Sequence, residues 1–388
     1  MKKSCIYIDQ KFHTKTGSTD FLIAILKRKF DVQRFFLGGF SRSDLEPLKA
    51  LEADLFVIFQ YDFLSALLLS LGKRVLVVPM YDGTGEIFDE HWLLQQGALI
   101  LNFSRLLNNK HRVLGLNSIY SQAFPKPVPA AQIRSRHYAP RFFLWERRPQ
   151  SGLSARWLCE QIRKTRISPE LVHLHLAPDP GQTSSLSADS AKAVFDPFAV
   201  NVTSWFPARA EMSAAMRTCN VYIAPRSAEG IGWSFLEAMA AGMLVLSRSA
   251  PTMSEYISNW ETGVLIADSI PDLEPAIIRR IGNSAADYIA DGFRLWERSQ
   301  EELLDRVCEY VSLQPVATSY TFDDVAMLPQ MFFWAHADYA ARVKYVANRG
   351  LPLPSGREEW TRKLSVRMST SPQLTAYVLA LHARWKKR

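Results

Sequence analysis

One stretch decides the fold, residues 224–242, which read APRSAEGIGWSFLEAMAAG. An apolar strand is predicted to end at Pro225, and a short loop with two glycines follows it. A helix then begins near Trp233 and ends at Gly242, since glycine is typical of a helix C-terminus. The first backbone amides of a helix lack partners within it and carry partial positive charge. The stretch therefore predicts a strand–loop–helix unit that binds a phosphate or diphosphate.

Two acidic residues flank the predicted phosphate site. Glu237 lies one turn into the helix, where an acidic side chain can accept hydrogen bonds from ribose hydroxyls, as in dinucleotide-binding folds. Glu229 precedes the glycines and would face the other end of a ligand, where a carboxylate suits sugar hydroxyls because it only accepts hydrogen bonds. One ligand accounts for both acids, namely a nucleoside diphosphate sugar.

Outward from this stretch, apolar runs and helical patterns alternate along most of the chain. The runs are continuous rather than alternating in polarity, as expected of strands that are covered on both faces of a parallel sheet. The pattern predicts an α/β fold built from strand–helix–strand units. Strands are expected at 5–8, 54–59, 74–79, 98–103, 142–145, 171–176, 200–202, 221–224, 244–246 and 263–266, with helices at 20–29, 62–71, 154–166, 209–217 and 233–241.

The chain is predicted to divide into three parts. Four prolines between residues 123 and 140 indicate a linker, which separates an N-terminal domain, 1–138, from a second domain, 139–285. From residue 286 to 388 the pattern becomes helical, with amphipathic stretches at 288–311, 323–346 and 371–387.

The stretch resembles the Glu-x7-Glu signature of the retaining nucleotide-sugar glycosyltransferases of family four. The downstream runs TMSEYI, at 252–257, and ETGVLI, at 261–266, also resemble that family. The resemblance implies the GT-B fold, in which two Rossmann-like domains face a cleft, here with a helical C-terminal tail. It also implies transfer of a hexose to a glycan or lipid-linked acceptor, with retention, in polysaccharide or lipopolysaccharide biosynthesis, and with no cofactor or metal.

The resemblance assigns roles residue by residue. Glu237 matches the ribose-binding acid, and Glu229 matches the catalytic-site acid that positions the donor sugar rather than attacking it. The donor-binding set is Arg147, Arg148, Gly230, Ile231, Gly232, Trp233 and Glu237. Where the family has a lysine after its arginine, this chain has Ser151. On the acceptor side, the family's glycine-rich loop is represented by the single Gly17, and its histidine has no counterpart, but Asp82 at a predicted strand end could bind a sugar hydroxyl. His13, His91 and His137 are interpreted as surface or hydrogen-bonded residues.

Three alternatives compete with an active GT-B glycosyltransferase. A catalytically inactive GT-B scaffold or binding subunit is the main alternative, because Ser151 departs from the family pattern. A nicotinamide-dependent oxidoreductase is a weaker one, since the third glycine of the dinucleotide fingerprint is Phe235 here. A metal-dependent transferase of the other major glycosyltransferase fold would need an Asp-x-Asp sequence, and the chain has none.

The charge of the chain is concentrated at its end. The formal net charge is +8, and residues 340–388 hold eleven Lys and Arg against two Glu. A nucleic-acid-binding protein would be expected to spread its basic residues over a recognition face, so no nucleic acid is expected as a partner. Such a basic tail predicts either a clamp across the domains or peripheral contact with an anionic membrane.

The remaining composition predicts a cytoplasmic protein, and a tail that binds lipid would place it peripherally at the inner face of the membrane. The apolar run after Lys3 ends at Asp9, too early for a signal peptide. The four cysteines, Cys5, Cys159, Cys219 and Cys308, are far apart and lack metal-ligand spacing, so we expect reduced, buried thiols.

Overall fold

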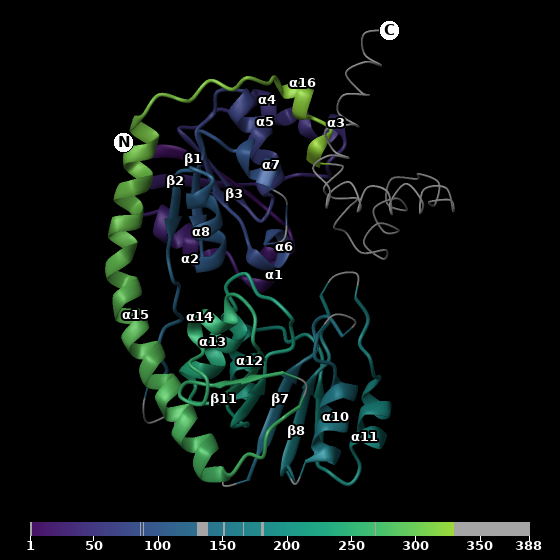
Figure 1. Cartoon of the computed structure of the whole chain (residues 1–388). Coiled ribbons are helices and arrows are strands. Elements are labelled where there is room, and N and C mark those ends of the chain that lie inside the picture. Colours follow the sequence, from purple (N-terminus) through teal and green to yellow (C-terminus); the bar gives the residue numbers. More distant parts are fainter. Residues whose placement is uncertain are drawn as a thin grey trace. The chain divides into compact units, whose positions relative to one another are not determined.

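The structure is a computed structural model that describes residues 2–85, 87, 89–129, 139–149, 152–165, 167–179, 182–267 and 269–329 (Figure 1). The chain forms two compact units. Of the described residues, unit 1 comprises those up to Ser121 together with 299–329, and unit 2 comprises those within Gln122–Arg298. The basic tail and the expected helix at 371–387 lie outside the described residues, as does most of the expected helix at 323–346.

Unit 1 contains a six-stranded parallel sheet in the order β2-β1-β3-β4-β5-β6. Its first strand, β1, pairs on both edges, so that Cys5 lies beside Val32 of β2 and Leu55 of β3. The strands are β1 (Lys3–Asp9), β2 (Phe30–Phe36), β3 (Leu55–Phe59), β4 (Val75–Val78), β5 (Leu99–Asn102) and β6 (Ser118–Tyr120).

Helices cover the sheet of unit 1 and bury its apolar strands. One core cluster packs Ile58, Val77 and Ile100 of the sheet against Leu67 of α5 and Trp92 of α7. All five of these side chains are fully buried. The helices of unit 1 are α1 (His13–Thr16), α2 (Asp20–Leu26), α3 (Arg42–Leu45), α4 (Pro47–Ala50), η1 (Asp62–Leu64), α5 (Ser65–Ser70), α6 (Tyr81–Thr84), α7 (Asp89–Leu93), α8 (Arg105–Val113) and α16 (Phe322–Val325).

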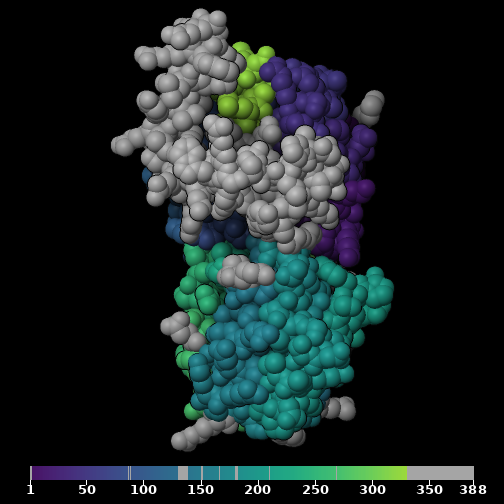
Figure 2. Space-filling view, turned by 90° about the vertical axis from the view of Figure 1, so that its right-hand side faces the viewer, coloured from purple at the N-terminus to yellow at the C-terminus, as the bar shows by residue number. Residues whose placement is uncertain are grey.

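Unit 2 contains a second six-stranded parallel sheet, in the order β12-β11-β10-β7-β8-β9. The strands are β7 (Arg141–Trp145), β8 (Leu171–His175), β9 (Val200–Thr203), β10 (Val221–Ile223), β11 (Leu244–Arg248) and β12 (Val264–Ile266). The helices are α10 (Ala155–Lys164), α11 (Ala188–Phe195), α12 (Arg209–Met216), α13 (Trp233–Ala240) and α14 (Met253–Tyr256). In Figure 2 the surface of this unit is coloured mostly teal.

Side chains alternate between the two faces of the unit 2 sheet. Phe142 and Leu144 of β7 pack with Leu158 of α10 and Phe195 of α11 in one core. The residue between them, Phe143, points to the other face, where its ring stacks on His173 and Tyr222 with centroids 4.9 and 6.0 Å apart. Figure 1 shows α10 and α11 side by side next to β8.

Helix α15 (Pro275–Ser312) is continuous over 38 residues and belongs to both units. Its start packs in the unit 2 core through Ile278 and Ile281. Near its end, the Tyr310 hydroxyl accepts a hydrogen bond from the Val75 amide at 3.0 Å and donates one to the Gly97 carbonyl at 2.8 Å. The structure describes α15 from residue 275, thirteen residues before the amphipathic stretch expected from residue 288.

The α/β fold class is confirmed, and every predicted strand is present within a few residues of its expected bounds. The sequence analysis missed β2 and β6, which are the two edge strands of the unit 1 sheet and so lack the continuous burial of central strands. It also missed α11, in which only Ala191 and Phe195 are buried. Among the described residues, no helix is both long and apolar enough to cross a membrane.

Candidate functional site

The sheet of unit 2 has a topological switch point beside β7. The chain runs from β7 to β8 on one side, and β10 pairs with β7 on the other. In open parallel sheets the loops at such a point diverge, and they leave a crevice outside the carboxyl ends of the strands where ligands bind. The loops that follow β7, β8 and β10 carry nearly all the charged residues described below, so we treat this edge as the candidate site.

The loop after β7 is joined directly to the loop after β10. The Leu153 amide donates a hydrogen bond to the Pro225 carbonyl at 2.6 Å. A Cβ atom at Gly152 would lie 2.0 Å from the same carbonyl oxygen, a backbone atom that cannot move aside cheaply. Only glycine at position 152 therefore permits this contact.

Glu146 joins the loop after β7 to the loop after β8. Its carboxylate is fully buried and accepts hydrogen bonds from the amides of Ala155 and Ser185, both at 2.8 Å. It also accepts one from the Ser185 hydroxyl at 2.5 Å. Three hydrogen-bond donors offset the cost of removing this carboxylate from water. Glu146 therefore has a structural role, in which it holds the two loops together.

Both predicted arginines bind one carboxylate. Arg147 Nε lies 2.8 Å from Asp179 Oδ1, and Arg148 Nε lies 2.8 Å from Asp179 Oδ2. Burial alone would raise the pKa of Asp179, but the charges of Arg147, Arg148 and Arg226 outweigh it and lower the pKa below its ordinary value. Asp179 is thus an ionised acceptor that holds the two guanidinium groups side by side.

The glycine loop reaches the N-terminus of α13, as the sequence predicts. Gly232 precedes the helix with φ = +85°, in the left-handed region, and makes no side-chain cap. A Cβ at Gly232 would lie 1.9 Å from the Phe235 ring. With glycine as the capping residue, no cap side chain occupies the space in front of the first turn, where an anion can meet the positive end of the helix.

The two predicted acids lie on either side of this helix start. Glu229 is 4% exposed and pairs with Arg226, whose Nη1 is 3.1 Å from Glu229 Oε2. Glu237 is half-buried in α13. Burial is the main cause that raises the pKa of Tyr222 in β10, and the charges of Glu229 and Glu237 raise it further while Arg147 lowers it. The charges of these three predicted site residues therefore all act on one buried tyrosine.

An aromatic cluster lies at the ends of β7, β8 and β9, next to Arg147. The Arg147 guanidinium lies 4.9 Å from the centre of the Trp145 ring. The His175 ring stacks on Phe206 at 4.8 Å, and Trp145 contacts the edge of Trp205 at 5.8 Å. Trp205 and Phe206 are half-exposed, so the cluster offers flat faces on which a planar ring can stack.

The predicted catalytic residue Glu229 and the predicted donor-binding residues all lie in unit 2 at this one edge. They are Arg147, Arg148, Glu229, Gly230, Ile231, Gly232, Trp233 and Glu237. Ser151 lies outside the described residues. The sequence analysis missed Asp179 and Arg226. Their position was a usable signal, because each follows the carboxyl end of a predicted strand within four residues.

The acceptor-side candidates lie in unit 1, in separate loops. Gly17 ends α1 with φ = +63°, and Asp82 is half-buried in α6, just after β4. Near the switch point of this sheet, between β1 and β3, His13 is hydrogen-bonded, as one of the two predicted alternatives has it, and its partner is Asp9, which the sequence analysis did not single out. His13 Nδ1 lies 2.5 Å from the buried Asp9 Oδ1, and the Thr19 hydroxyl donates to Asp9 Oδ2 at 2.8 Å.

His91 is also hydrogen-bonded and buried, with Nε2 2.6 Å from Asp62 Oδ2, whereas His137 lies outside the described residues. Within the described part of the chain, no group of three or more His, Cys, Asp or Glu side chains is arranged to hold a metal ion.

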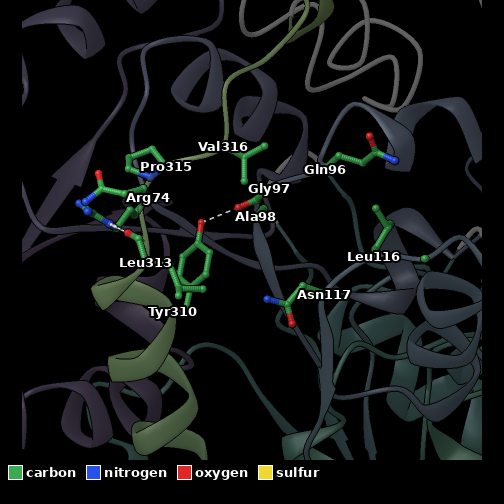
Figure 3. Close-up of a pocket in the computed structure, with 12 residues that line it drawn as sticks. Arg74, Gln96, Gly97, Ala98, Leu116, Asn117, Tyr310, Leu313, Pro315 and Val316 are labelled. Atoms are coloured by element: carbon green, nitrogen blue, oxygen red, sulfur yellow. Dashed lines mark hydrogen bonds between the residues drawn. The ribbon is translucent and has the colours of Figure 1, made fainter.

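A cavity of about 320 Å³ lies at the edge of the unit 1 sheet that is formed by the amino ends of its strands (Figure 3). Arg74, Gly97 and Asn117 line it together with Tyr310 and Val316 from the end of α15 and the segment that follows. Arg74 Nε donates to the Leu313 carbonyl at 2.8 Å, so the walls are tied together. None of the predicted site residues lines this cavity. Because Tyr310 of α15 lines it, we interpret the cavity as a gap in the packing of the end of α15 against the unit 1 sheet.

Comparison with known families identifies one segment. Residues 149–283 match the family model described as Glycosyl transferases group 1. This match begins within the loop after β7, beyond Arg147 and Arg148, and it covers α13 and both predicted acids. No curated protein matches the chain in sequence.

Solved structures show that the chain has the GT-B fold. The sucrose-phosphate synthase of Thermosynechococcus elongatus is similar with a TM-score of 0.61 and 12% identity, over 79% of this chain and 99% of that one. A glycosyltransferase of Rickettsia africae is similar with a TM-score of 0.53 and 12% identity, over 79% of this chain and 99% of that one. HepE of Anabaena, in complex with UDP and glucose, has a TM-score of 0.52 and 13% identity, over 80% of this chain and 99% of that one.

Two buried histidines in unit 2 predict a loss of stability in acid. Burial lowers the pKa of His173 and of His175 from 6.5 to about 4, and the charge of His173 further lowers that of His175. The unfolded chain therefore binds more protons between these values. Their contribution to the free energy of unfolding is complete above pH 6.5. As the pH falls toward 4, the free energy of unfolding drops by on the order of 2–3 kcal/mol for each histidine.

Urea unfolding at a series of pH values measures this loss. Replacement of both residues, His173→Asn with His175→Asn, should flatten the dependence between pH 6.5 and 4, whatever it does to stability at pH 7.5. Parallel curves for wild type and variant would show that other groups cause the acid sensitivity.

Proposed function

We propose that the chain is a glycosyltransferase that moves a hexose from a nucleoside diphosphate sugar to a glycan or lipid-linked acceptor, with retention of configuration. The observation that carries the proposal is the convergence of two arginines, a glycine-capped helix start and two acids at one switch point. The match of residues 149–283 to glycosyltransferases of group 1 supports it independently.

Each part of the donor has a partner of suitable chemistry in unit 2. The ribose hydroxyls would donate to Glu237, and the sugar hydroxyls to Glu229. The diphosphate would lie before the first turn of α13, near Arg147 and Arg148. When the bond to the sugar breaks, negative charge grows on the departing diphosphate, and the helix start and the arginines stabilise it.

The main alternative is a GT-B protein that binds a nucleotide sugar without transferring it. The same residues would serve either role, so binding and turnover have to be measured on the same preparation. HepE, which shares the fold, is described with UDP and glucose. UDP-glucose is therefore the first donor to test, followed by other nucleotide sugars. Unit 1, with Gly17 and Asp82, is proposed to bind the acceptor.

The two acids should have separable effects on the donor. Glu237→Ala removes a ribose contact and should weaken both UDP and UDP-glucose, whereas Glu229→Ala should weaken UDP-glucose alone or its turnover. Loss of a hydrogen bond to a charged group corresponds to about a ten- to hundredfold change in affinity. Calorimetry with each ligand measures both effects.

The control for this pair is Glu211→Ala, which removes an exposed glutamate from α12 of the same unit. It should leave both affinities unchanged. Wild-type affinity and turnover in the Glu229 and Glu237 variants would refute the assignment of the site.

Transfer is proposed to need no metal ion, because the helix start and arginines can stabilise the leaving diphosphate. Turnover of the donor should therefore persist in excess EDTA. Complete loss in EDTA that manganese or magnesium restores would mean that a cation carries out this stabilisation instead.

Peripheral membrane contact is proposed for the basic tail, which would bring the enzyme to a lipid-linked acceptor. Wild type should sediment with vesicles that contain anionic lipid, and less so as salt is raised. Neutralising Arg384, Lys386, Lys387 and Arg388 together should reduce this binding. Equal recovery in the supernatant with and without anionic lipid would leave the tail as a structural clamp.

A further inference from the structure

The proposed diphosphate site needs more positive charge than the helix start and the two arginines after β7 supply. The start of a helix contributes roughly half a positive charge, against the two or more negative charges of a nucleoside diphosphate. Arg147 and Arg148 both contact the same carboxylate, that of Asp179. The lysine that a family-four resemblance predicts after the arginine is Ser151 in this chain.

Arg226 is a candidate for a further cation at the proposed diphosphate site. It is the third residue after β10 and directly follows Pro225, whose carbonyl binds the loop that carries Arg147 and Arg148. It is 7% exposed, and its Nη1 lies 3.1 Å from Glu229 Oε2. Its charge also lowers the pKa of Asp179, the carboxylate that Arg147 and Arg148 contact.

We propose that Arg226 is a cation of the diphosphate site, supplied by the loop after β10 in place of the lysine missing after β7. The inference rests on the proposed function and adds a residue to the same site. Within this site, Asp179 and Glu229 balance the arginines when no donor is bound. The bound diphosphate then adds charge-assisted hydrogen bonds from Arg226, which are strengthened in a buried crevice.

A purely positioning role for Arg226 makes a different prediction. If the guanidinium only orients Glu229, its removal affects the sugar end of the donor and leaves the diphosphate untouched. Nucleoside diphosphate and monophosphate therefore separate the two roles, because only the first spans the position of the second phosphate. Glu229→Ala gives the reference phenotype for a defect at the sugar end.

The experiment compares the affinities of UDP, UMP and UDP-glucose by calorimetry in wild type, Arg226→Ala, Arg226→Lys and Glu229→Ala. GDP and ADP with their monophosphates are used as well, so that the choice of base does not limit the result. Arg217→Ala is the matched control, because it removes an exposed arginine of unit 2. Circular dichroism and thermal unfolding establish that each variant is folded.

The proposal predicts that Arg226→Ala weakens the diphosphate about ten- to hundredfold and the monophosphate by less than about threefold. Arg226→Lys should recover part of the diphosphate affinity, since it keeps the charge but loses the planar fork. Arg217→Ala should bind as wild type does.

Removal of Arg226 takes a buried cation away from the Glu229 carboxylate, which can prevent folding. The double variant Arg226→Ala with Glu229→Gln removes the charge of that carboxylate as well. It should show the same selective loss of diphosphate affinity when compared with Glu229→Gln alone.

Unchanged diphosphate affinity in folded Arg226→Ala, with a loss for UDP-glucose equal to that of Glu229→Ala, would overturn the inference and leave Arg226 as a positioning residue. Wild type that binds none of the nucleoside diphosphates or UDP-glucose would instead overturn the proposed function. The two failures are therefore distinguishable.

Discussion

The contact between Gly152 and Pro225 is the constraint on which the candidate site depends. It brings the loops after β7 and β10 together at the switch point of the unit 2 sheet, where the order of the strands reverses. A side chain at position 152 would collide with the Pro225 carbonyl and force these loops apart. The arginines after β7 and the acid after β10 are near one another because this contact is made.

Electrostatics explains how so many charges tolerate burial at one edge. Asp179 lies between Arg147 and Arg148, and Glu229 lies against Arg226, so each of these five charges has an opposite neighbour. Burying a charge is costly unless it is paired, and a site that alternates in sign avoids that cost before any ligand arrives. An anionic ligand then enters a region where three guanidinium groups are already held in place. Glu146 contributes differently, since it binds only amides and a hydroxyl and thus fixes the loops without joining the charged set.

Much of this arrangement could be predicted from the sequence because it depends on local patterns. Continuous apolar runs identified the central strands, and the glycines at 230 and 232 with the helix after them identified the start of α13. Edge strands β2 and β6 were missed because an edge strand is half-exposed and lacks such a run. Asp179 and Arg226 were missed for another reason. Each follows the end of a predicted strand, but its ionic partners depend on which strands are neighbours in the sheet, and β10 lies beside β7 although β8 and β9 come between them in the chain.

Hydrogen–deuterium exchange with and without a nucleoside diphosphate tests the central claim most directly, because it locates binding without any substitution. The account predicts that UDP or another bound nucleoside diphosphate slows exchange in residues 146–149, 152–155 and 225–240, which form the loops after β7 and β10 and helix α13. It also predicts little change at the amino edge of the same sheet, in residues 139–141 and 218–220. Slowed exchange confined to unit 1, or spread evenly over unit 2 with these loops unaffected, would contradict it.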